Sequence, residues 1–401
     1  MHVIRRILPA SFAVASLALT GLASVAPAQG WTLKTLYSFK GGSDGSYPMG
    51  NLVRDNATGD LYGTTYRGGQ DTCDLNYHVP CGTVFKLARN GSKEILHSFT
   101  GEDGGRPQAG LIRDAAGNLY GTTPDGGGAC NGGFGCGVVY KLAPDGTYTV
   151  LHSFEGGAND GAFSQARLTR DKSSGDLYGT APQGGDLNCD LNGYGCGVVF
   201  KLAASGSLTL LHAFHGGSDG TAPGLGVALD SSGSVVGTTY DGGKGWGDVF
   251  KISPDGTKAS LHTFNRRNVS QPSGEFLEDK LGNLYGSSFG SARHGTIFEI
   301  TRDGKYELLH KFAKSGNYWE GGGPLGQLVR DRSGVIYGTE YFSAGIFQFQ
   351  PDGTYELLHT FTGDEGSQLE GGLIADSHGN LYGMTADGGT YKQGTIYELK
   401  K

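Results

Sequence analysis

Four short motifs recur seven times along this chain of 401 residues, with 48 to 60 residues between successive copies. They first follow one another as LVRD at residues 52–55, LYGT at 61–64, GTVFKL at 82–87 and LHSF at 96–99, and a lone LYSF precedes them at 36–39. Later copies of GTVFKL begin at Gly137, Gly197, Gly247, Gly295, Gly345 and Gly394. A repeat of this length indicates an array of similar supersecondary units.

The segments between the motifs predict how the motifs are joined. Asp114 and Gly117 bracket the connection after the second LVRD-like motif, and these residue types suit the first and fourth positions of a type I turn. Pro144-Asp145-Gly146, after the third motif, is typical of a tight hairpin. We therefore expect each repeat to be a four-stranded antiparallel meander. Its strands A, B, C and D correspond to the four motifs in that order.

Neither face of these strands is clearly polar, and this feature predicts how the sheets pack. In residues 148–154 (YTVLHSF) apolar side chains fall on both faces. A sandwich strand normally keeps one solvated face, whereas blades stacked radially bury both. The sequence therefore predicts an all-β, seven-bladed β-propeller of four-stranded antiparallel blades. A parallel β-helix is the alternative, but its coils are shorter than these repeats and lack hairpin turns.

The two ends of the repeat array predict how the ring closes. The array begins with a lone strand D at residues 33–39 and ends with strands A, B and C at 371–399. We expect the N-terminal strand to complete the last blade. Residues 31–401 then form a single propeller domain.

The N-terminal segment has the pattern of a signal peptide. Arg5 and Arg6 precede an apolar run at residues 12–25, and Ala26-Pro27-Ala28 offers a cleavage site. The apolar run is short for a membrane span. We expect residues 1–28 to be removed and the mature chain, without a transmembrane segment, to be secreted or periplasmic. An uncleaved anchor is the alternative.

The run LYSFxGGxDG, GLIRDxxGNLYGTTxxGG and GTVFKLxPDG resembles the tandem repeat of the GloVer-containing (Gloeo/Verruco) family. The resemblance covers essentially the whole mature chain. It implies an exported, surface-associated bacterial repeat protein, often with a C-terminal anchor, and it implies no established activity. This chain ends in ELKK without a sorting signal or hydrophobic tail, so we expect a released or periplasmic protein.

Six cysteines form three local pairs, each in the B–C connection of one of the first three repeats. The pairs are Cys73 with Cys81, Cys130 with Cys136, and Cys189 with Cys196. An even number of cysteines at matching positions in an exported chain predicts disulfide bonds. Zinc is the alternative, but it normally needs four ligands and each connection offers only two thiols.

The D–A and B–C connections share one face of the predicted propeller, which we call the loop face. They are longer and more varied than the tight A–B and C–D turns, so we expect ligand binding on the loop face, around the mouth of the central channel. Five of the D–A loops each carry an aspartate that is a candidate calcium ligand: Asp44, Asp103, Asp160, Asp219 and Asp364. The alternative is that each Asp caps its own turn. No other cofactor is predicted.

Residues that break the repeat are the better candidates for ligand contacts. Those expected on the loop face are Arg106, Trp246, Arg266, Arg267, His294, Trp319, Glu320, Tyr341 and Phe342. Tyr and Trp beside Arg and acids suit stacking on a sugar ring or gripping a peptide. The alternative is that these are ordinary loop residues that contact no ligand. The histidines repeated in strand D fall on separate blades, so we expect them to pack rather than to converge on a metal.

These observations favour a non-catalytic binding or scaffold module for an extracellular glycan, peptide or protein, acting as a monomer. The chain has no GxSxG, HExxH or P-loop motif, and no catalytic residue is assigned. A net charge of −7 with 18% charged residues argues against nucleic-acid binding. The alternative function is a periplasmic metal-dependent lactonase-like or glycan-degrading enzyme, for which Glu278, His294 and Glu320 are the irregular candidates.

Overall fold

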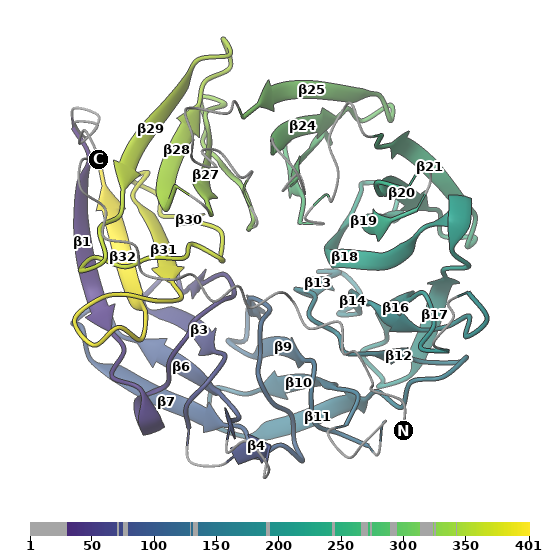
Figure 1. Ribbon diagram of the computed structural model, residues 1–401, viewed down its shortest axis with the longest axis horizontal. Helices are drawn as coiled ribbons and strands as arrows, with labels where there is room; N and C mark the ends of the chain where they lie inside the picture. The colour runs from purple at the N-terminus through teal and green to yellow at the C-terminus, as the bar shows by residue number, and fades with distance from the viewer. Residues whose placement is uncertain are drawn as a thin grey trace, which may run out of the picture.

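Seven four-stranded antiparallel sheets stand in a ring around a central axis (Figure 1). The computed structural model describes residues 30–69, 72–74, 79–128, 130, 135–189, 193–242, 245–265, 272, 275–288, 295–312, 324, 326–341 and 343–401. These residues contain no α-helix, and their two 3₁₀ turns are η1 (Gly42–Asp44) and η2 (Gly217–Asp219). The predicted seven-bladed propeller is confirmed.

Strand A is two residues long in six blades and nine residues long in blade 4. Blade 1 contains β2 (Val53–Arg54), β3 (Leu61–Thr65), β6 (Thr83–Leu87) and β7 (Lys93–Ser98); blade 2 contains β8 (Ile112–Arg113), β9 (Leu119–Thr123), β10 (Val138–Leu142) and β11 (Tyr148–Ser153). Blade 3 contains β13 (Thr169–Arg170), β14 (Leu177–Ala181), β16 (Val198–Leu202) and β17 (Leu208–Ala213); blade 4 contains β18 (Thr221–Leu229), β19 (Val235–Asp241), β20 (Asp248–Ile252) and β21 (Lys258–Thr263).

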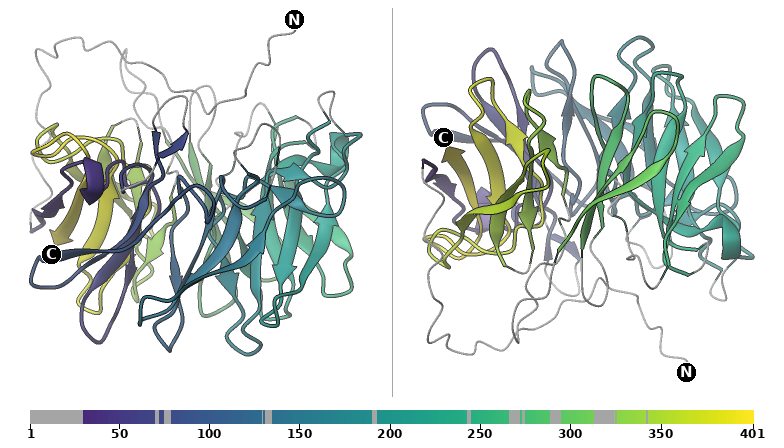
Figure 2. Two further views of the ribbon diagram at one scale, coloured as in Figure 1. Left: turned by 90° about the horizontal axis from the view of Figure 1, so that it is seen from below. Right: turned by 90° about the horizontal axis from the view of Figure 1, so that it is seen from above.

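Blades 5 and 6 repeat this order, and two small ribbons decorate the loops. Blade 5 contains β22 (Leu277–Glu278), β23 (Leu284–Ser288), β24 (Thr296–Ile300) and β25 (Tyr306–Lys311); blade 6 contains β26 (Val329–Arg330), β27 (Ile336–Glu340), β28 (Gly345–Phe349) and β29 (Tyr355–Thr360). The ribbons are β4 (Thr72–Asp74) with β5 (Val79–Pro80), and β12 (Gly161–Ala162) with β15 (Gln183–Gly184). Figure 2 shows from the side how the connections of all blades gather on two opposite faces.

The two ends of the described chain close the ring in blade 7. Its strands are β30 (Ile374–Ala375), β31 (Leu381–Thr385), β32 (Thr395–Lys400) and, on the outside, β1 (Thr32–Ser38). β1 runs antiparallel to β32, with Thr32 opposite Lys400 and Ser38 opposite Thr395. Figure 1 shows this purple strand along the yellow one. The predicted closure is confirmed.

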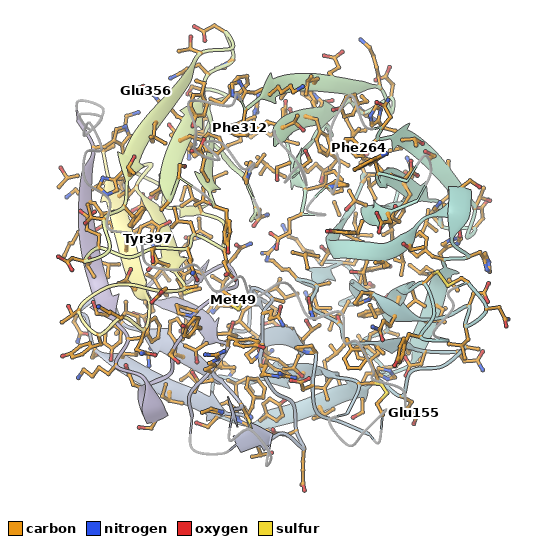
Figure 3. All side chains as sticks on the ribbon, viewed as in Figure 1. Met49, Glu155, Phe264, Phe312, Glu356 and Tyr397 are labelled. Atoms are coloured by element: carbon orange, nitrogen blue, oxygen red, sulfur yellow. A yellow bond between two sulfur atoms is a disulfide. The ribbon has the colours of Figure 1, made fainter. Side chains whose placement is uncertain are left out.

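The repeated aromatic residues form the core between blades. In blade 1 Gly63 of β3 lies opposite Phe85 of β6, and a Cβ on this glycine would stand 2.7 Å from the ring. The buried Phe99 at the end of β7 then meets Tyr140 of blade 2, with 5.3 Å between ring centroids. Figure 3 labels equivalent rings, such as Phe264, within the wall of the propeller. Each such ring contributes roughly 1.5–3 kcal/mol through burial.

One predicted register in blade 6 is wrong by one residue. The sequence placed Gly345 at the position that Gly82 holds in blade 1. In the structure Ala344 takes this left-handed position, with φ 48°, and its carbonyl accepts the N–H of Phe361. Gly82, with φ 88°, accepts the N–H of Phe99 in the same way. The position is defined by this backbone conformation, which glycine favours but alanine adopts here.

Candidate functional site

In blades 1 to 5 and 7 a bulge interrupts the described sheet just before strand A and projects toward the axis. In blade 4 the register of β18 on β19 jumps from Pro223↔Thr239 to Val227↔Gly237, so residues 224–226 leave the ladder. In blade 1 the chain leaves the sheet after the isolated Ser46↔Arg67 bridge and rejoins it at β2. Met49, in the blade 1 bulge, lies at the inner wall of the ring in Figure 3. Bulges of this kind re-aim side chains and are frequent beside functional sites.

Strand B of one blade holds the bulge of the next by hydrogen bonds. Thr122 Oγ1 donates to the carbonyl of Ala166 at 2.9 Å, and Thr339 Oγ1 donates to the carbonyl of Gly371 at 3.1 Å. Ser287 Oγ makes the equivalent bond to Pro324 at 3.0 Å. In blades 1, 2, 3, 5 and 6 the hydroxyl at this position of the second motif therefore holds the bulge of the next blade.

Each A–B turn begins with an aspartate, such as Asp114. The residue four positions before this aspartate ends the bulge, and we call the seven residues at this position the inner ring. They are Asn51, Gly110, Arg167, Gly226, Glu275, Gln327 and Gly372. Elsewhere the motifs nearly repeat, but at this position three glycines alternate with four chemically different polar residues. The sequence comparison overlooked the inner ring because it began strand A one residue later. Aligning the repeats on the turn aspartate would have revealed it.

The bulges of blades 6, 7, 1 and 2 touch one another through their glycines, and we call this the pinched side. A Cβ on Gly326 would stand 2.0 Å from the amide nitrogen of Gly372. A Cβ on Gly50 would stand 2.4 Å from the backbone of Ala109, and one on Gly371 would stand 2.7 Å from the Gly50 carbonyl. Backbones approach this closely only where side chains are absent.

The bulges of blades 3 to 6 leave a cavity, and we call this the open side. The cavity has a volume of about 180 Å³. Its lining is Arg167, Thr169, Gly226, Val227, Ala228, Leu229, Glu275, Phe276, Glu278 and Gln327. Three of the four polar inner-ring residues therefore line one cavity, together with an additional carboxylate and a wall of mixed polar and apolar groups.

A partly buried carboxylate and a buried amide span the axis between the two sides. Asn51 Nδ2 of blade 1 donates to Glu275 Oε2 of blade 5 at 2.7 Å, and Asn51 Oδ1 accepts the backbone N–H of Gly372. Burial raises the pKa of the Glu275 carboxyl, while the positive charge of Arg167 and the Asn51 hydrogen bond act in the opposite direction. Within the described residues the guanidinium of Arg167 has no hydrogen-bond partner, and its Nε is buried.

The second cavity carboxylate, Glu278, breaks a repeat of arginines. The equivalent residues Arg54, Arg113, Arg170 and Arg330 carry the opposite charge. Arg113 illustrates the usual contact, since its Nη2 lies 2.8 Å from Asp55 Oδ2 in the turn of the preceding blade. Burial, Asp230 and Asp279 raise the pKa of Glu278. This strand end is therefore acidic where four other blades are basic.

Three of the predicted loop-face residues are described, and they do not converge. Arg106 forms a two-point ion pair with Asp125, in which Nη2 lies 2.7 Å from Oδ1, and this pairing raises the arginine pKa. Trp246 packs partly buried against the core between blades 4 and 5. Tyr341 is half-buried, and burial and the charge of Glu370 raise its pKa. Arg266, Arg267, His294, Trp319, Glu320 and Phe342 lie outside the described residues.

Glu370 is a loop-face residue that the sequence reasoning missed. It lies in the bulge of blade 7, and burial raises its pKa from 4.5 to about 7. The charge of Glu370 is felt by Tyr341 of the neighbouring blade. A carboxyl that titrates near neutrality is suited to donating and accepting protons.

The predicted calcium ligands engage their own loops. Asp103 accepts the Thr100 N–H at 2.8 Å, and its other oxygen lies 2.9 Å from His97 Nε2. Asp44, Asp160 and Asp219 likewise accept an N–H from their own loops. In blade 7 this role belongs to Glu365, which accepts the Thr362 N–H at 2.9 Å, rather than to the neighbouring Asp364. No three His, Cys, Asp or Glu side chains of the described residues are placed to hold a metal ion, and calcium at these positions stays a prediction.

Two of the predicted disulfide bonds are present in the described loops. Cys130 pairs with Cys136 and Cys189 pairs with Cys196, with Cα–Cα distances of 5.3 and 6.0 Å. Cys81 is also disulfide-bonded, while the side chain of Cys73 lies outside the described part. The carbonyls of Cys136 and Cys196 accept the N–H groups of Phe163 and Ala222 from the adjoining D–A loops. The disulfides therefore brace both kinds of loop on this face.

Comparison with known proteins identifies the repeat and the fold. Residues 24–246 and 226–401 match the family model described as Gloeobacter/Verrucomicrobia repeat. A streptogramin B lyase structure has a TM-score of 0.61 at 14% identity, with 92% of this chain and 97% of that chain covered. Virginiamycin B lyase from Staphylococcus aureus with quinupristin has a TM-score of 0.60 at 12% identity, with 92% and 99% covered. At such identities the likeness shows the fold alone.

Two further comparisons concern relatives and membranes. A search of the curated proteins finds no match. Among the described residues, no helix has the length and apolar character needed to span a bilayer.

Proposed function

Since this chain belongs to the Gloeobacter/Verrucomicrobia repeat family, we propose that it is an exported propeller that binds a small polar group, without catalysis, in the cavity on the open side of its channel. The observation that carries the proposal is the inner ring. Arg167, Glu275 and Gln327 line one cavity at a position where three other blades have glycine. A polar cluster held on a rigid scaffold is the usual form of a recognition site.

The charges of this cluster support binding rather than packing. Charged groups held in partly buried positions seldom stabilise a fold better than apolar residues of the same size. Arg167 also keeps its guanidinium free of hydrogen-bond partners among the described residues. Donors held in this way favour a ligand that supplies acceptors, such as hydroxyl, carbonyl or carboxylate oxygens.

The size of the cavity limits the ligand group. Pockets for drug-sized molecules measure roughly 300–1,000 Å³, and this cavity is about 180 Å³. It suits one sugar or one amino-acid residue, free or at the end of an extracellular glycan or peptide.

Export is supported by two features. The first is the signal peptide predicted from the sequence at residues 1–28, which lie outside the described residues. The second is the presence of disulfide bonds in the loops, because such bonds persist in oxidising compartments. We place the mature protein in the periplasm or the extracellular medium.

Calorimetric titration tests the binding site. The ligands are D-glucose, D-glucosamine, D-galacturonate and glycylglycine. We expect at least one to bind, and Arg167→Met and Glu275→Gln to weaken it at least tenfold. Arg113→Met is the matched control, because Arg113 contacts Asp55 and does not line the cavity. Binding that survives both cavity substitutions would place the site elsewhere.

A second candidate function is acid–base catalysis on the loop face, as in a lactonase-like or glycan-degrading enzyme. The specific observation is Glu370, whose pKa of about 7 suits proton transfer, beside Tyr341. Two structural neighbours are named as lyases, although their likeness extends only to the fold. Turnover of a glycan or lactone that Glu370→Gln lowers at least a hundredfold would establish this function. Turnover that is equal in the variant would reject Glu370 as the catalytic group.

A further inference from the structure

The cavity runs from the inner ring toward the face opposite the loop face. Strand A starts at the D–A loop and ends at the A–B turn, so positions along it measure depth in the channel. The lining follows this direction from Glu275 to Glu278 in blade 5 and from Gly226 to Leu229 in blade 4. The next residues, Asp279 and Asp230, begin the A–B turns. The described wall therefore extends from the inner ring to the start of the tight turns.

At the other end of the cavity Asn51 crosses the channel. Its amide group bonds both Glu275 and the backbone of Gly372, so it bridges blades 1, 5 and 7. We call the inner-ring end of the described lining the floor of the cavity, and the end beside the A–B turns its opening.

The two ends of the cavity differ in charge. At the floor, the negative charge of Glu275 is offset by Arg167. At the opening, Glu278 stands where other blades have arginine, and it faces Asp230 and Asp279. Asp230 pairs with Lys251 at 2.7 Å. Among the described residues no cation lies within ion-pair distance of Glu278.

We infer that the axial cavity takes a ligand group that carries a primary ammonium, admitted from the face of the A–B turns, with the ammonium at Glu278 and an acceptor oxygen at Arg167. This inference rests on the proposed binding function and specifies its ligand class. The ammonium supplies the positive charge that the missing arginine leaves out, at a carboxylate that is exposed to solvent. The unpaired guanidinium at the floor orients the other end of the group.

A labelling experiment tests the route of access. Lys280 is exposed in the A–B turn of blade 5, and Lys392 is exposed in the B–C loop of blade 7. Lys280→Cys and Lys392→Cys are each coupled to a bulky polyethylene glycol maleimide. We expect the first label to slow the association of D-glucosamine at least fivefold and the second to leave it unchanged. The reverse pattern would assign access to the loop face.

Matched ligand pairs test the charge. D-Glucosamine is compared with D-glucose, and L-lysine with L-norleucine, in wild-type protein and in Glu278→Gln. We expect the ammonium member of a pair to bind wild-type protein at least tenfold more tightly and Glu278→Gln to abolish the difference. Glu356→Gln is the control, because it makes the same charge change at the outer rim (Figure 3).

The outcomes separate this inference from the proposed function. Neutral members that bind as tightly as their ammonium partners, in a way that Arg167→Met weakens, would overturn the ammonium inference and leave the binding function standing. Absence of binding by every member of both pairs would overturn the ammonium inference. Binding that is insensitive to both Arg167→Met and Glu278→Gln would overturn the proposed axial site itself.

Discussion

The pinched side and the open side of the channel are built from the same repeat, yet one is packed backbone to backbone and the other encloses a cavity. On the pinched side Gly50, Gly326 and Gly371 allow neighbouring bulges to interlock. On the open side Arg167 and Glu275 stand on equivalent bulges and line open space. The same bulge can therefore either pack against its neighbours or line a cavity: the pinched-side blades carry glycines at or just before the inner ring, whereas Arg167 and Glu275 occupy it on the open side.

The largest effect is expected from filling the pinched side. Gly326→Ala places a Cβ 2.0 Å from the backbone of Gly372, where no flexible side chain can yield. We expect a loss of about 3 kcal/mol in the free energy of unfolding, as for severe overpacking, measured by denaturant titration. Gly363→Ala is the control, because nothing lies within 4 Å of its added Cβ. Equal stability of the two variants would show that the bulges do not interlock.

The second largest effect is expected on the pH dependence of the free energy of unfolding, through Glu370 in the bulge of blade 7. Glu370 has a pKa of about 7 in the folded protein against an ordinary value of 4.5, so the unfolded chain releases this proton first as the pH rises. The free energy of unfolding should therefore fall between pH 4.5 and 7 by up to about 3 kcal/mol and stay lower above that range. Glu370→Gln should flatten this part of the stability–pH curve. A curve of unchanged slope would contradict the burial of the carboxyl.

A smaller loss of stability is expected from the removal of the Asn51 side chain, which joins the pinched side to the open side. Asn51→Ala removes the bonds to Glu275 and to the Gly372 amide, which should cost about 1–2 kcal/mol in the free energy of unfolding. Asn56→Ala is the control, because Asn56 is exposed and its side chain accepts a 3.2 Å hydrogen bond from Arg54 in its own blade. If both variants unfold at the same denaturant concentration, the bridge across the axis has no energetic role.

The smallest effect is expected for Glu275→Gln, which keeps an acceptor for Asn51 and removes a charge that burial disfavours. Because the folded-state pKa is raised, the ionised carboxyl weakens the fold as the pH rises. The variant should be slightly more stable than wild-type protein at pH 7 and equal to it at pH 4. Thermal unfolding at the two pH values measures this, and a loss of stability at pH 7 would show that the pair with Arg167 stabilises the fold.

The sequence predicted the architecture because every blade repeats the residues that define it. Turn residues such as Asp114 and Gly117 set the hairpins, and rings such as Phe99 mark the packing between blades. The closure of the ring was predicted by counting strands, because the chain begins with a lone strand D and ends with strands A, B and C. The one shifted register, at Ala344, arose because alanine took a left-handed position that glycine holds in blades 1 to 4 and 7.

The site was harder to predict for the same reason. A repeat directs attention to what its copies share, whereas the inner ring is defined by how they differ. The segment before Leu52 resembled a loop in the sequence, and its bulge toward the axis follows from register jumps that composition does not encode. Asn51 and Glu275 lie 224 residues apart, so no local pattern links them. Whether the loop-face residues bind a ligand stays a prediction.

The antiparallel pairing of β1 with β32 also orders the folding of the chain. Thr32 meets Lys400, so this seam is among the contacts of greatest sequence separation in the molecule, and contacts of that kind form slowly. Blades 1 to 6 are each complete from contiguous segments and can assemble as their residues emerge. The last sheet cannot, because its outer strand is translated first and its other three last. A chain threaded across a membrane from its N-terminus would therefore remain an open arc until translocation ends, with β1 waiting as an unpaired edge.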